Sequence, residues 1–315
     1  MMDPLKKSMF SAVVVLGLSL GLGLMAGCGG GGSADTTPVT PPAVKLAGLD
    51  AQLLADNKAR LVITPGTDTA SYCLRTDAST PAAGDACFGT QTTQELATSG
   101  SATLGTTVRL WAKTSAGVVS QHKSLSLPGK TCSGDAYATS TASSLPTACL
   151  ITDSGELVMA LESSKAPISV KNFLRYVNEG FYNGTHVHRV SSSFVAQGGG
   201  FVFDGTSYIK KTATYPSIAL ETTANTGLSN TQYTVAMARS GALDSATTEF
   251  FINLVNNTSL NTTGGGYAVF GQVIFGQTTT ISAMAKVAVK SSTILSGETS
   301  LPVTPLALQW AYQIK

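Results

Sequence analysis

Few side chains in this sequence have types and spacings that suggest metal binding. His186 and His188 are two residues apart on a strand-like segment, so both point to one face and could form half of a metal site. The remaining histidine, His122, is distant in the sequence. The glycine run 198–200 lacks the Lys-Ser/Thr of a phosphate-binding loop, which favours close backbone packing instead. We therefore expect no metal and no cofactor.

The first cysteine lies at the end of an N-terminal targeting pattern. Lys6 and Lys7 precede the uncharged residues 8–27, and Cys28 closes the segment LMAGC. This pattern resembles the signal and lipobox of bacterial lipoproteins, which implies removal of residues 1–27 and diacylation of Cys28. An uncleaved membrane helix is the alternative, since a span takes about 20 apolar residues. A glycine run directly after Cys28 favours the lipoprotein, with a Gly/Thr/Pro-rich tether over residues 28–43.

The same resemblance predicts where the chain is located. It implies a periplasmic protein of the bacterial cell envelope that contacts the membrane through its lipid anchor. Residue 29 is glycine and not the aspartate that often retains lipoproteins at the inner membrane. The outer membrane is therefore the expected location.

Export also bears on the four other cysteines, because disulfides persist in oxidising compartments. Four cysteines allow three pairings, of which we favour the sequence-local one, Cys73–Cys87 and Cys132–Cys149. Each bridge would close a short loop and constrain the unfolded chain by about 3 kcal/mol. A zinc site is the alternative, but the C-x₂-C spacing of such sites is absent.

Length and charge limit the possible classes of protein. A chain of 315 residues suggests about two domains. Charged residues make up 12%, against about 25% in typical globular proteins. The net charge of +2 argues against nucleic acid as a partner, which needs a concentrated basic face. A monomer is expected.

Residues 44–127 have the pattern of a small all-β domain. Short β-prone runs alternate with Gly, Pro, Asp and Ser clusters. In residues 108–113, Val108, Leu110 and Ala112 alternate with Arg109, Trp111 and Lys113, as in a strand with one buried face. The segment WAKTSAG at residues 111–117 resembles a hairpin of immunoglobulin-like modules. The sequence therefore predicts a small immunoglobulin-like β-sandwich.

Residues 128–150 are rich in Ser, Thr, Ala and Gly, which predicts a connector to a second domain over residues 151–315. That domain has many strand-like segments, at residues 155–161, 233–238, 250–255, 267–273 and 306–314. Helical spacing follows Pro167 and is allowed at residues 281–287. Many strands with two helices predict a mainly β fold, with a closed antiparallel barrel in this half.

A series of segments in this half resembles bacterial cyclophilins in order and approximate spacing. They are APISVKNF at 166–173, VHRV at 187–190, FVAQGGGF at 194–201, VAMAR at 235–239, FFIN at 250–253 and YAVFG at 267–271. The resemblance covers about residues 155–315. It implies an eight-stranded antiparallel barrel with two helices and peptidyl-prolyl cis/trans isomerase activity on Xaa-Pro bonds.

The resemblance also implies roles for individual residues. Arg189 would donate a hydrogen bond to the prolyl nitrogen, and Gln197 would orient Arg189 and contact the substrate carbonyl. Backbone groups near Ala238 and Arg239 would hold the substrate chain. The proline pocket would be lined by Phe194, Val195, Phe251, Leu260 and Tyr267. Without the resemblance, the apolar members of this set would be assigned to the core.

The sequence departs from the cyclophilin pattern at several positions. Ser191, Ser192 and Ser193 replace the usual Ile/Val-Pro-Gly, which predicts a looser turn. Val195 and Ser259 replace larger residues, which predicts a wider or wetter pocket. Glu249 replaces a glutamine of the substrate-binding set and is expected to place a carboxylate near Arg189, drawing it away from the substrate. We therefore expect weaker or differently selective activity.

Two functions are compatible with this pattern. The first is a folding catalyst of the cell envelope that acts on clients with Xaa-Pro bonds. The alternative is a catalytically weak binding module or chaperone for proline-containing segments. The presence of Arg189, Phe194, Gln197 and Phe251 together favours the enzyme.

Overall fold

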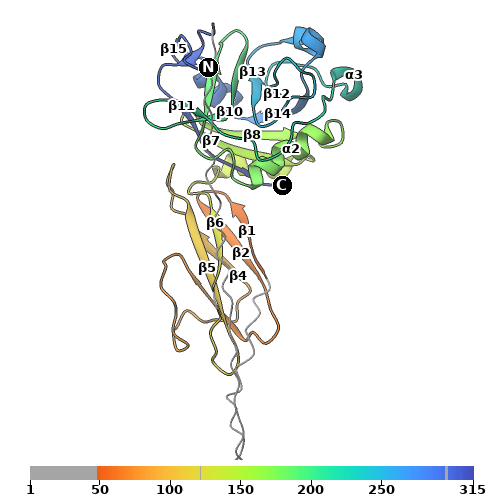
Figure 1. Ribbon diagram of the computed structural model, residues 1–315. Helices are drawn as coiled ribbons and strands as arrows, with labels where there is room; N and C mark the ends of the chain where they lie inside the picture. Colours follow the sequence, from red (N-terminus) through yellow and green to blue (C-terminus); the bar gives the residue numbers. More distant parts are fainter. Residues whose placement is uncertain (1–47, 121, 295–296) are drawn as a thin grey trace, which may run out of the picture. The chain divides into compact units, whose positions relative to one another are not determined.

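The computed structural model of the chain describes residues 48–120, 122–294 and 297–315 (Figure 1). The proposed signal at residues 1–27, the tether at 28–43 and the lipidation site Cys28 lie outside the described residues. No helix among the described residues is both long enough and apolar enough to span a bilayer.

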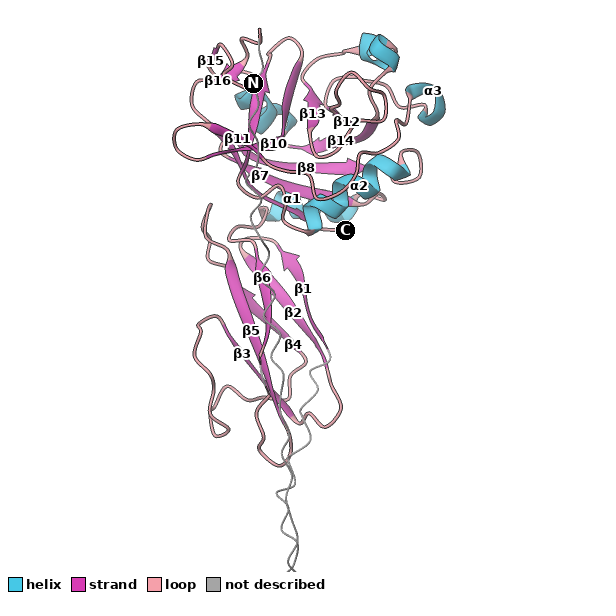
Figure 2. Cartoon of the chain, viewed as in Figure 1, coloured by secondary structure: helices cyan, strands magenta, loops and turns pink. Residues whose placement is uncertain are grey.

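Two three-stranded antiparallel sheets form the first folded part (Figure 2). One sheet has the order β1-β2-β4 and the other β3-β5-β6. Their bounds are β1 Gly48–Leu54, β2 Lys58–Thr64, β3 Ser71–Arg75, β4 Thr93–Ala97, β5 Thr106–Lys113 and β6 Lys123–Leu127.

Side chains from both sheets form a single buried cluster. Leu61 and Ile63 alternate along β2, and Val108, Leu110 and Ala112 alternate along β5 as the sequence predicted. Trp111 was expected on the exposed face, but its side chain is also buried, with its ring 5.1 Å from that of His122. The two-sheet organisation agrees with a β-sandwich, and the immunoglobulin-like assignment stays a prediction.

The region expected to be a connector, residues 128–150, contains regular structure. It includes the helix α1 (Gly134–Ala142) and part of the strand β7 (Thr147–Thr152). The side chain of Ser133 accepts a hydrogen bond from the backbone N–H of Ala136 and so caps the helix. Only Ala136 and Ser140 of α1 are buried, so the helix has no apolar stripe that the sequence could reveal.

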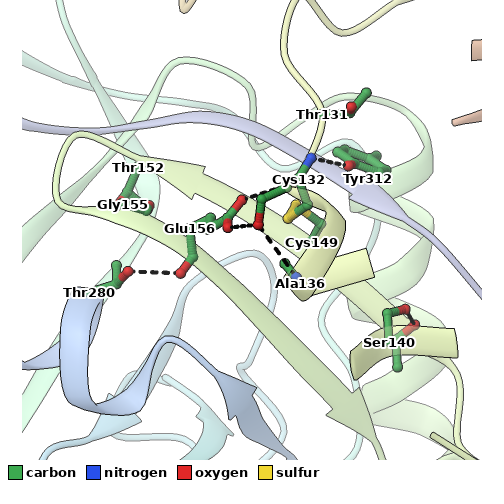
Figure 3. The surroundings of a disulfide bond; sticks show 12 residues. Thr131, Cys132, Ala136, Ser140, Cys149, Thr152, Gly155, Glu156, Thr280 and Tyr312 are labelled. Carbon is green, nitrogen blue, oxygen red and sulfur yellow. Dashed lines mark hydrogen bonds between the residues drawn. A yellow bond between two sulfur atoms is a disulfide. The ribbon is translucent and has the colours of Figure 1, made fainter. Parts of the chain in front are cut away.

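Both sequence-local disulfides are present. Cys73 pairs with Cys87 and Cys132 pairs with Cys149. The second bridge connects the chain before α1 to β7, and the backbone N–H of Cys132 donates to the hydroxyl of Tyr312 at 2.6 Å (Figure 3). The predicted pairing is therefore confirmed.

The second folded part is a closed eight-stranded antiparallel barrel, as predicted. The strand order is β10-β13-β12-β14-β8-β7-β17-β9, and β9 pairs back onto β10 to close it. The short strand β11 (Tyr208–Lys210) is added to β10 outside this ring. The remaining bounds are β8 Gly155–Leu161, β9 Thr185–Val190, β10 Val195–Phe203, β12 Thr234–Met237, β13 Phe250–Asn253, β14 Val269–Phe275 and β17 Leu306–Gln313.

One long helix packs against the barrel core. The helix α2 (Pro167–Asn178) buries Val170, Phe173, Tyr176 and Val177, which are spaced by three or four residues as in an amphipathic helix. The ring of Phe173 lies 5.4 Å from that of Phe250 on β13.

The other helical segments differ from the expected single second helix. Residues 281–287 were expected to be helical, but the helix begins earlier and ends earlier, as a π-helical turn Gln277–Ile281 followed by α4 (Ser282–Met284). Another short helix is α3 (Thr223–Thr226), so the described residues of the predicted barrel domain contain one long α-helix, α2, and two short ones. Two 3₁₀ turns, η1 (Thr258–Asn261) and η2 (Thr263–Gly265), follow β13.

Candidate active site

Arg189, Gln197 and Phe251 come from three neighbouring strands. In the register of β9 with β10, Arg189 faces Gln197, and in the register of β10 with β13, Gln197 faces Phe251. Residues directly opposite each other on antiparallel strands project from the same face of a sheet. The barrel therefore presents the three side chains in a row across adjacent strands.

A register shift in β9 gives Arg189 its direction. Val187 and Val190 both belong to the barrel core, although strict alternation would put residues three apart on opposite faces. Gly198 pairs with Val187 while Gln197 pairs with Arg189, so β9 carries one extra residue at this point. Such bulges re-aim side chains and are frequent beside active sites. This one lets both valines point inward while Arg189 lines an outer cavity.

The cavity has a volume of about 230 Å³. Its buried lining is apolar, with Val195, Phe251 and Leu260 each less than 10% exposed. The ring of Tyr267 meets that of Phe251 edge-on at 5.8 Å. The complete lining is Arg189, Phe194, Val195, Gln197, Ala238, Arg239, Phe251, Leu260 and Tyr267. All the residues expected from the sequence except Glu249 line this cavity.

The guanidinium of Arg189 has a carboxylate partner, but not the expected one. Its Nε donates to Oε2 of Glu298 at 2.6 Å. The guanidinium also lies over the ring of Phe194, 5.4 Å from the ring centre. The prediction that Glu249 draws Arg189 away from the substrate is therefore wrong, because the ion pair of Arg189 is with Glu298.

Glu249 lies behind the cavity lining. Its Oε2 accepts a hydrogen bond from Nε2 of Gln197 at 3.0 Å and lies 3.4 Å from Nε2 of the fully buried His188. Burial favours the protonated form of Glu249, but the contacts with His188 and Gln197 and the charge of Lys210 outweigh it, so the pKa of Glu249 is below its ordinary value. Glu249 thus contacts the site through Gln197, as an ionised hydrogen-bond acceptor.

A network of buried asparagines holds the loops around the cavity. Nδ2 of Asn257 donates to the backbone carbonyl of Phe194 at 2.8 Å and to Oδ1 of Asn253 at 2.8 Å. Asn253 donates in turn to Asn230, whose Nδ2 donates to Asn261 and to the carbonyl of Tyr267. These residues were not predicted from the sequence. The four-residue spacing of Asn253, Asn257 and Asn261 was the available signal.

The serine turn before the cavity was expected to be loose. The turn of Ser191, Ser192 and Ser193 is closed by hydrogen bonds from Ser191 N to Val195 O at 2.9 Å and from Phe194 N to Ser191 O at 2.8 Å. It is therefore not an open turn.

The side chain of Arg239 donates to the carbonyls of Gly264 and Gly266 and lies over the ring of Tyr267. Arg239 thus braces the η2 loop at the rim of the cavity.

The two histidines on β9 have separate aromatic neighbours. The ring of His186 meets Tyr208 at 5.7 Å, and burial lowers the pKa of His186. The ring of His188 meets Phe201 at 4.6 Å. Residues 48–120, 122–294 and 297–315 contain no cluster of three or more His, Cys, Asp or Glu side chains that could hold a metal.

Comparisons with known proteins agree with the barrel fold. The family model described as cyclophilin type peptidyl-prolyl cis-trans isomerase/CLD matches residues 148–303. Peptidyl-prolyl cis-trans isomerase A of Dickeya dadantii is 42% identical over 168 residues, which are 53% of this chain and 83% of that protein.

Two further relatives carry the same description. A peptidyl-prolyl cis-trans isomerase of Streptomyces antibioticus is 43% identical over 51% of this chain and 95% of its own length. Peptidyl-prolyl cis-trans isomerase B of Escherichia coli is 48% identical over 40% of this chain and 76% of its own length. With the closed eight-stranded barrel and this extent of identity, the chain belongs to the cyclophilin-type peptidyl-prolyl cis-trans isomerases.

Proposed function

We propose that the chain is a peptidyl-prolyl isomerase of the bacterial cell envelope, anchored by a lipid on Cys28, that acts on Xaa-Pro bonds of exported polypeptides. The segment LMAGC and the apolar residues before it support the anchor. The two disulfides fit an oxidising compartment.

The observation that carries the catalytic part is the make-up of the cavity. An Xaa-Pro bond isomerises slowly because amide resonance imposes a barrier of about 18–20 kcal/mol. A hydrogen bond to the prolyl nitrogen localises its lone pair and weakens that resonance. In the cavity, the cationic donor Arg189 stands beside a buried apolar lining that includes Phe251 and Leu260. A donor next to an apolar pocket is the arrangement that this reaction requires.

Gln197 and the apolar lining also have roles in the proposed reaction. Gln197 is adjacent to Arg189 across the strand pair and contacts the carbonyl of the residue before proline. The apolar lining holds the proline ring as it rotates and excludes water, which strengthens the hydrogen bond from Arg189. No step needs a nucleophile, a metal or a transferred proton.

Exchange spectroscopy on a short Xaa-Pro peptide tests the catalytic proposal. Substoichiometric amounts of the chain should produce cis/trans exchange cross-peaks that the peptide alone does not show on the same timescale. Phe251→Ala should weaken them, because the pocket loses its buried ring. Binding of the peptide without faster exchange would instead support the non-catalytic alternative.

Metabolic labelling with a fatty-acid probe tests the proposed location. The wild-type chain should carry the label in the membrane fraction, and Cys28→Ala should lose it. Equal labelling of the two chains would exclude lipidation at Cys28.

A further inference from the structure

The side chain of Glu298 is held by groups on its own segment as well as by Arg189. Its Oε2 accepts the hydrogen bond from Nε of Arg189 at 2.6 Å. Its Oε1 accepts from the backbone N–H of Thr299 at 3.0 Å and from the hydroxyl of Ser300 at 2.5 Å. Both oxygens of the carboxylate therefore have donors, and the carboxylate cannot rotate without losing at least one of them.

The backbone fixes Glu298 and Arg189 to each other. The N–H of Val190, the residue after Arg189 on β9, donates to the carbonyl of Ser300 at 2.7 Å. The next residue, Leu301, is buried and begins β16 (Leu301–Pro302). Although Arg189 and Glu298 are 109 positions apart in the sequence, this main-chain hydrogen bond close to both residues holds the pair in register.

The contacts of Arg189 leave its terminal groups Nη1 and Nη2 available to the substrate. Glu298 binds only Nε, and the guanidinium carbon of Arg189 lies over the ring of Phe194, 5.4 Å from the ring centre. Among the residues that the structure describes, none accepts a hydrogen bond from Nη1 or Nη2 of Arg189. The bond at Nε limits rotation of the guanidinium, so the directions of its two terminal amino groups are restricted before substrate binds.

We propose that Glu298 is a positioning residue for the isomerase reaction, which binds Nε of Arg189 so that Nη1 and Nη2 face the substrate. The proposal rests on the proposed catalytic role of Arg189. Preorganisation is the reason for the effect, since a donor that is already aligned needs no rearrangement when the amide twists. The Ser300 hydroxyl above all, together with Arg189, also keeps the pKa of Glu298 below its ordinary value, so the carboxylate is ionised at neutral pH.

The kinetic test compares Glu298→Ala with the wild-type full chain. Exchange or coupled assays should show kcat reduced by about tenfold with KM nearly unchanged, because alignment matters most in the transition state. Glu298→Gln, whose amide oxygen can still accept from Nε, should lose less. Both variants keep the main-chain bond between Val190 and Ser300. A control is Glu95→Ala, which removes another arginine–glutamate pair, the one with Arg60 outside the barrel, and should leave kcat unchanged.

Two further measurements separate positioning from a general loss of structure. Added acetate should restore part of the kcat of Glu298→Ala and have no effect on the wild type. The Nε–Hε resonance of Arg189 in a ¹H–¹⁵N spectrum should shift in Glu298→Ala and return toward its wild-type position with acetate.

The outcomes distinguish the positioning role of Glu298 from the catalytic role of Arg189, on which it depends. Wild-type or higher kcat in Glu298→Ala would overturn the positioning role, as would a slow variant whose Arg189 resonance is unchanged or that acetate does not rescue. Arg189→Ala is measured alongside. If Arg189→Ala kept full activity, the catalytic proposal itself would fail, whatever the result at Glu298.

Discussion

The carboxylate of Glu249 accepts a hydrogen bond from Gln197 behind the cavity and lies 3.4 Å from His188. Glu249 does not line the cavity itself but anchors the carboxamide of Gln197, which does. The neighbouring backbone leaves it little room, since a Cβ at Gly200 would come within 2.5 Å of Cγ of Glu249. The position of Gln197 therefore depends on a tightly packed carboxylate.

Glu249→Ala should slow the isomerase by roughly fivefold, or about 1 kcal/mol, because Gln197 loses its acceptor. Glu249→Gln should keep most of the activity, since an amide oxygen can accept the same hydrogen bond. Measuring kcat/KM for both variants checks this. The control is Glu162→Ala, which removes the partner of Lys165. Equal rates for Glu249→Ala and the wild type would contradict the role in anchoring Gln197.

The lowered pKa of Glu249 predicts that the stability of the folded chain depends on pH. Its contacts lower its pKa in the folded chain, so the unfolded chain binds the proton first as the pH falls. The stabilisation is complete above the unfolded pKa of about 4.3 and is lost as the pH falls through the folded value. The difference in Tm between the wild type and Glu249→Gln should therefore shrink below about pH 4. A difference that does not change with pH would count against an ionised Glu249.

At the scale of elements, the helix α2 depends on a side chain from outside it. Ala166 precedes the helix and offers no side-chain cap. Glu221 supplies one instead, accepting from the backbone N–H of Ile168 at 3.0 Å and of Ser169 at 2.8 Å. The hydroxyl of Ser169 donates to the same carboxylate at 2.6 Å. A buried carboxylate at this end also interacts favourably with the helix dipole.

Glu221→Ala should destabilise the chain by about 2 kcal/mol, because orphaned N–H groups and a buried hydroxyl lose their acceptor. Urea unfolding measures the change. Glu179→Ala is the matched control, since Glu179 is at the opposite end of α2, where a carboxylate is unfavourable. It should be neutral or slightly stabilising. Equal destabilisation by both variants would rule out a specific cap.

The elements that the sequence predicted are those with a periodic apolar pattern. The helix after Pro167 and the alternating strand β17 (Leu306–Gln313) were recognised because one face of each is buried. The helix α1 was not, because most of its residues are Ala, Ser or Thr and only Ala136 and Ser140 are buried. The strand β7 was split because all its residues are buried and do not alternate.

In the candidate site, too, some residues were predicted from the sequence and others were not. Arg189, Gln197 and Phe251 lie in segments that resemble a known family, and the structure brings them to one cavity. The groups that support the site could not be predicted. Tertiary pairing across long stretches of sequence brings Glu298 to Arg189, and it brings the asparagine network to the backbone of Phe194. The expectation about Glu249 was wrong for this reason. The sequence could not show on which side of Gln197 its carboxylate lies.

At the scale of the whole molecule, the isomerase part has its own core and includes more of the chain than expected. Cys132 and β7 belong to it, since Cys132 bonds to Cys149 and β7 pairs with both β8 and β17. A fragment of residues 128–315 should therefore fold and isomerise Xaa-Pro peptides. A fragment of residues 150–315 cuts β7 and removes the disulfide, which typically contributes about 2–4 kcal/mol.

Circular dichroism and thermal unfolding of the two fragments test this boundary. The longer fragment should have a cooperative transition, and the shorter one should melt at a clearly lower temperature or remain unfolded. An unfolded 128–315 fragment would mean that the preceding sheets are required for the barrel.

The most direct test of the catalytic account is exchange spectroscopy on one Xaa-Pro peptide with the wild-type chain and Arg189→Ala. The account predicts that Arg189→Ala lowers the catalysed exchange rate by about 10²–10³, equivalent to about 2.7–4 kcal/mol, because the cavity loses its donor to the prolyl nitrogen. Thermal unfolding should change little, since the side chain of Arg189 lines an open cavity. Exchange at the wild-type rate in a folded Arg189→Ala chain would contradict the account.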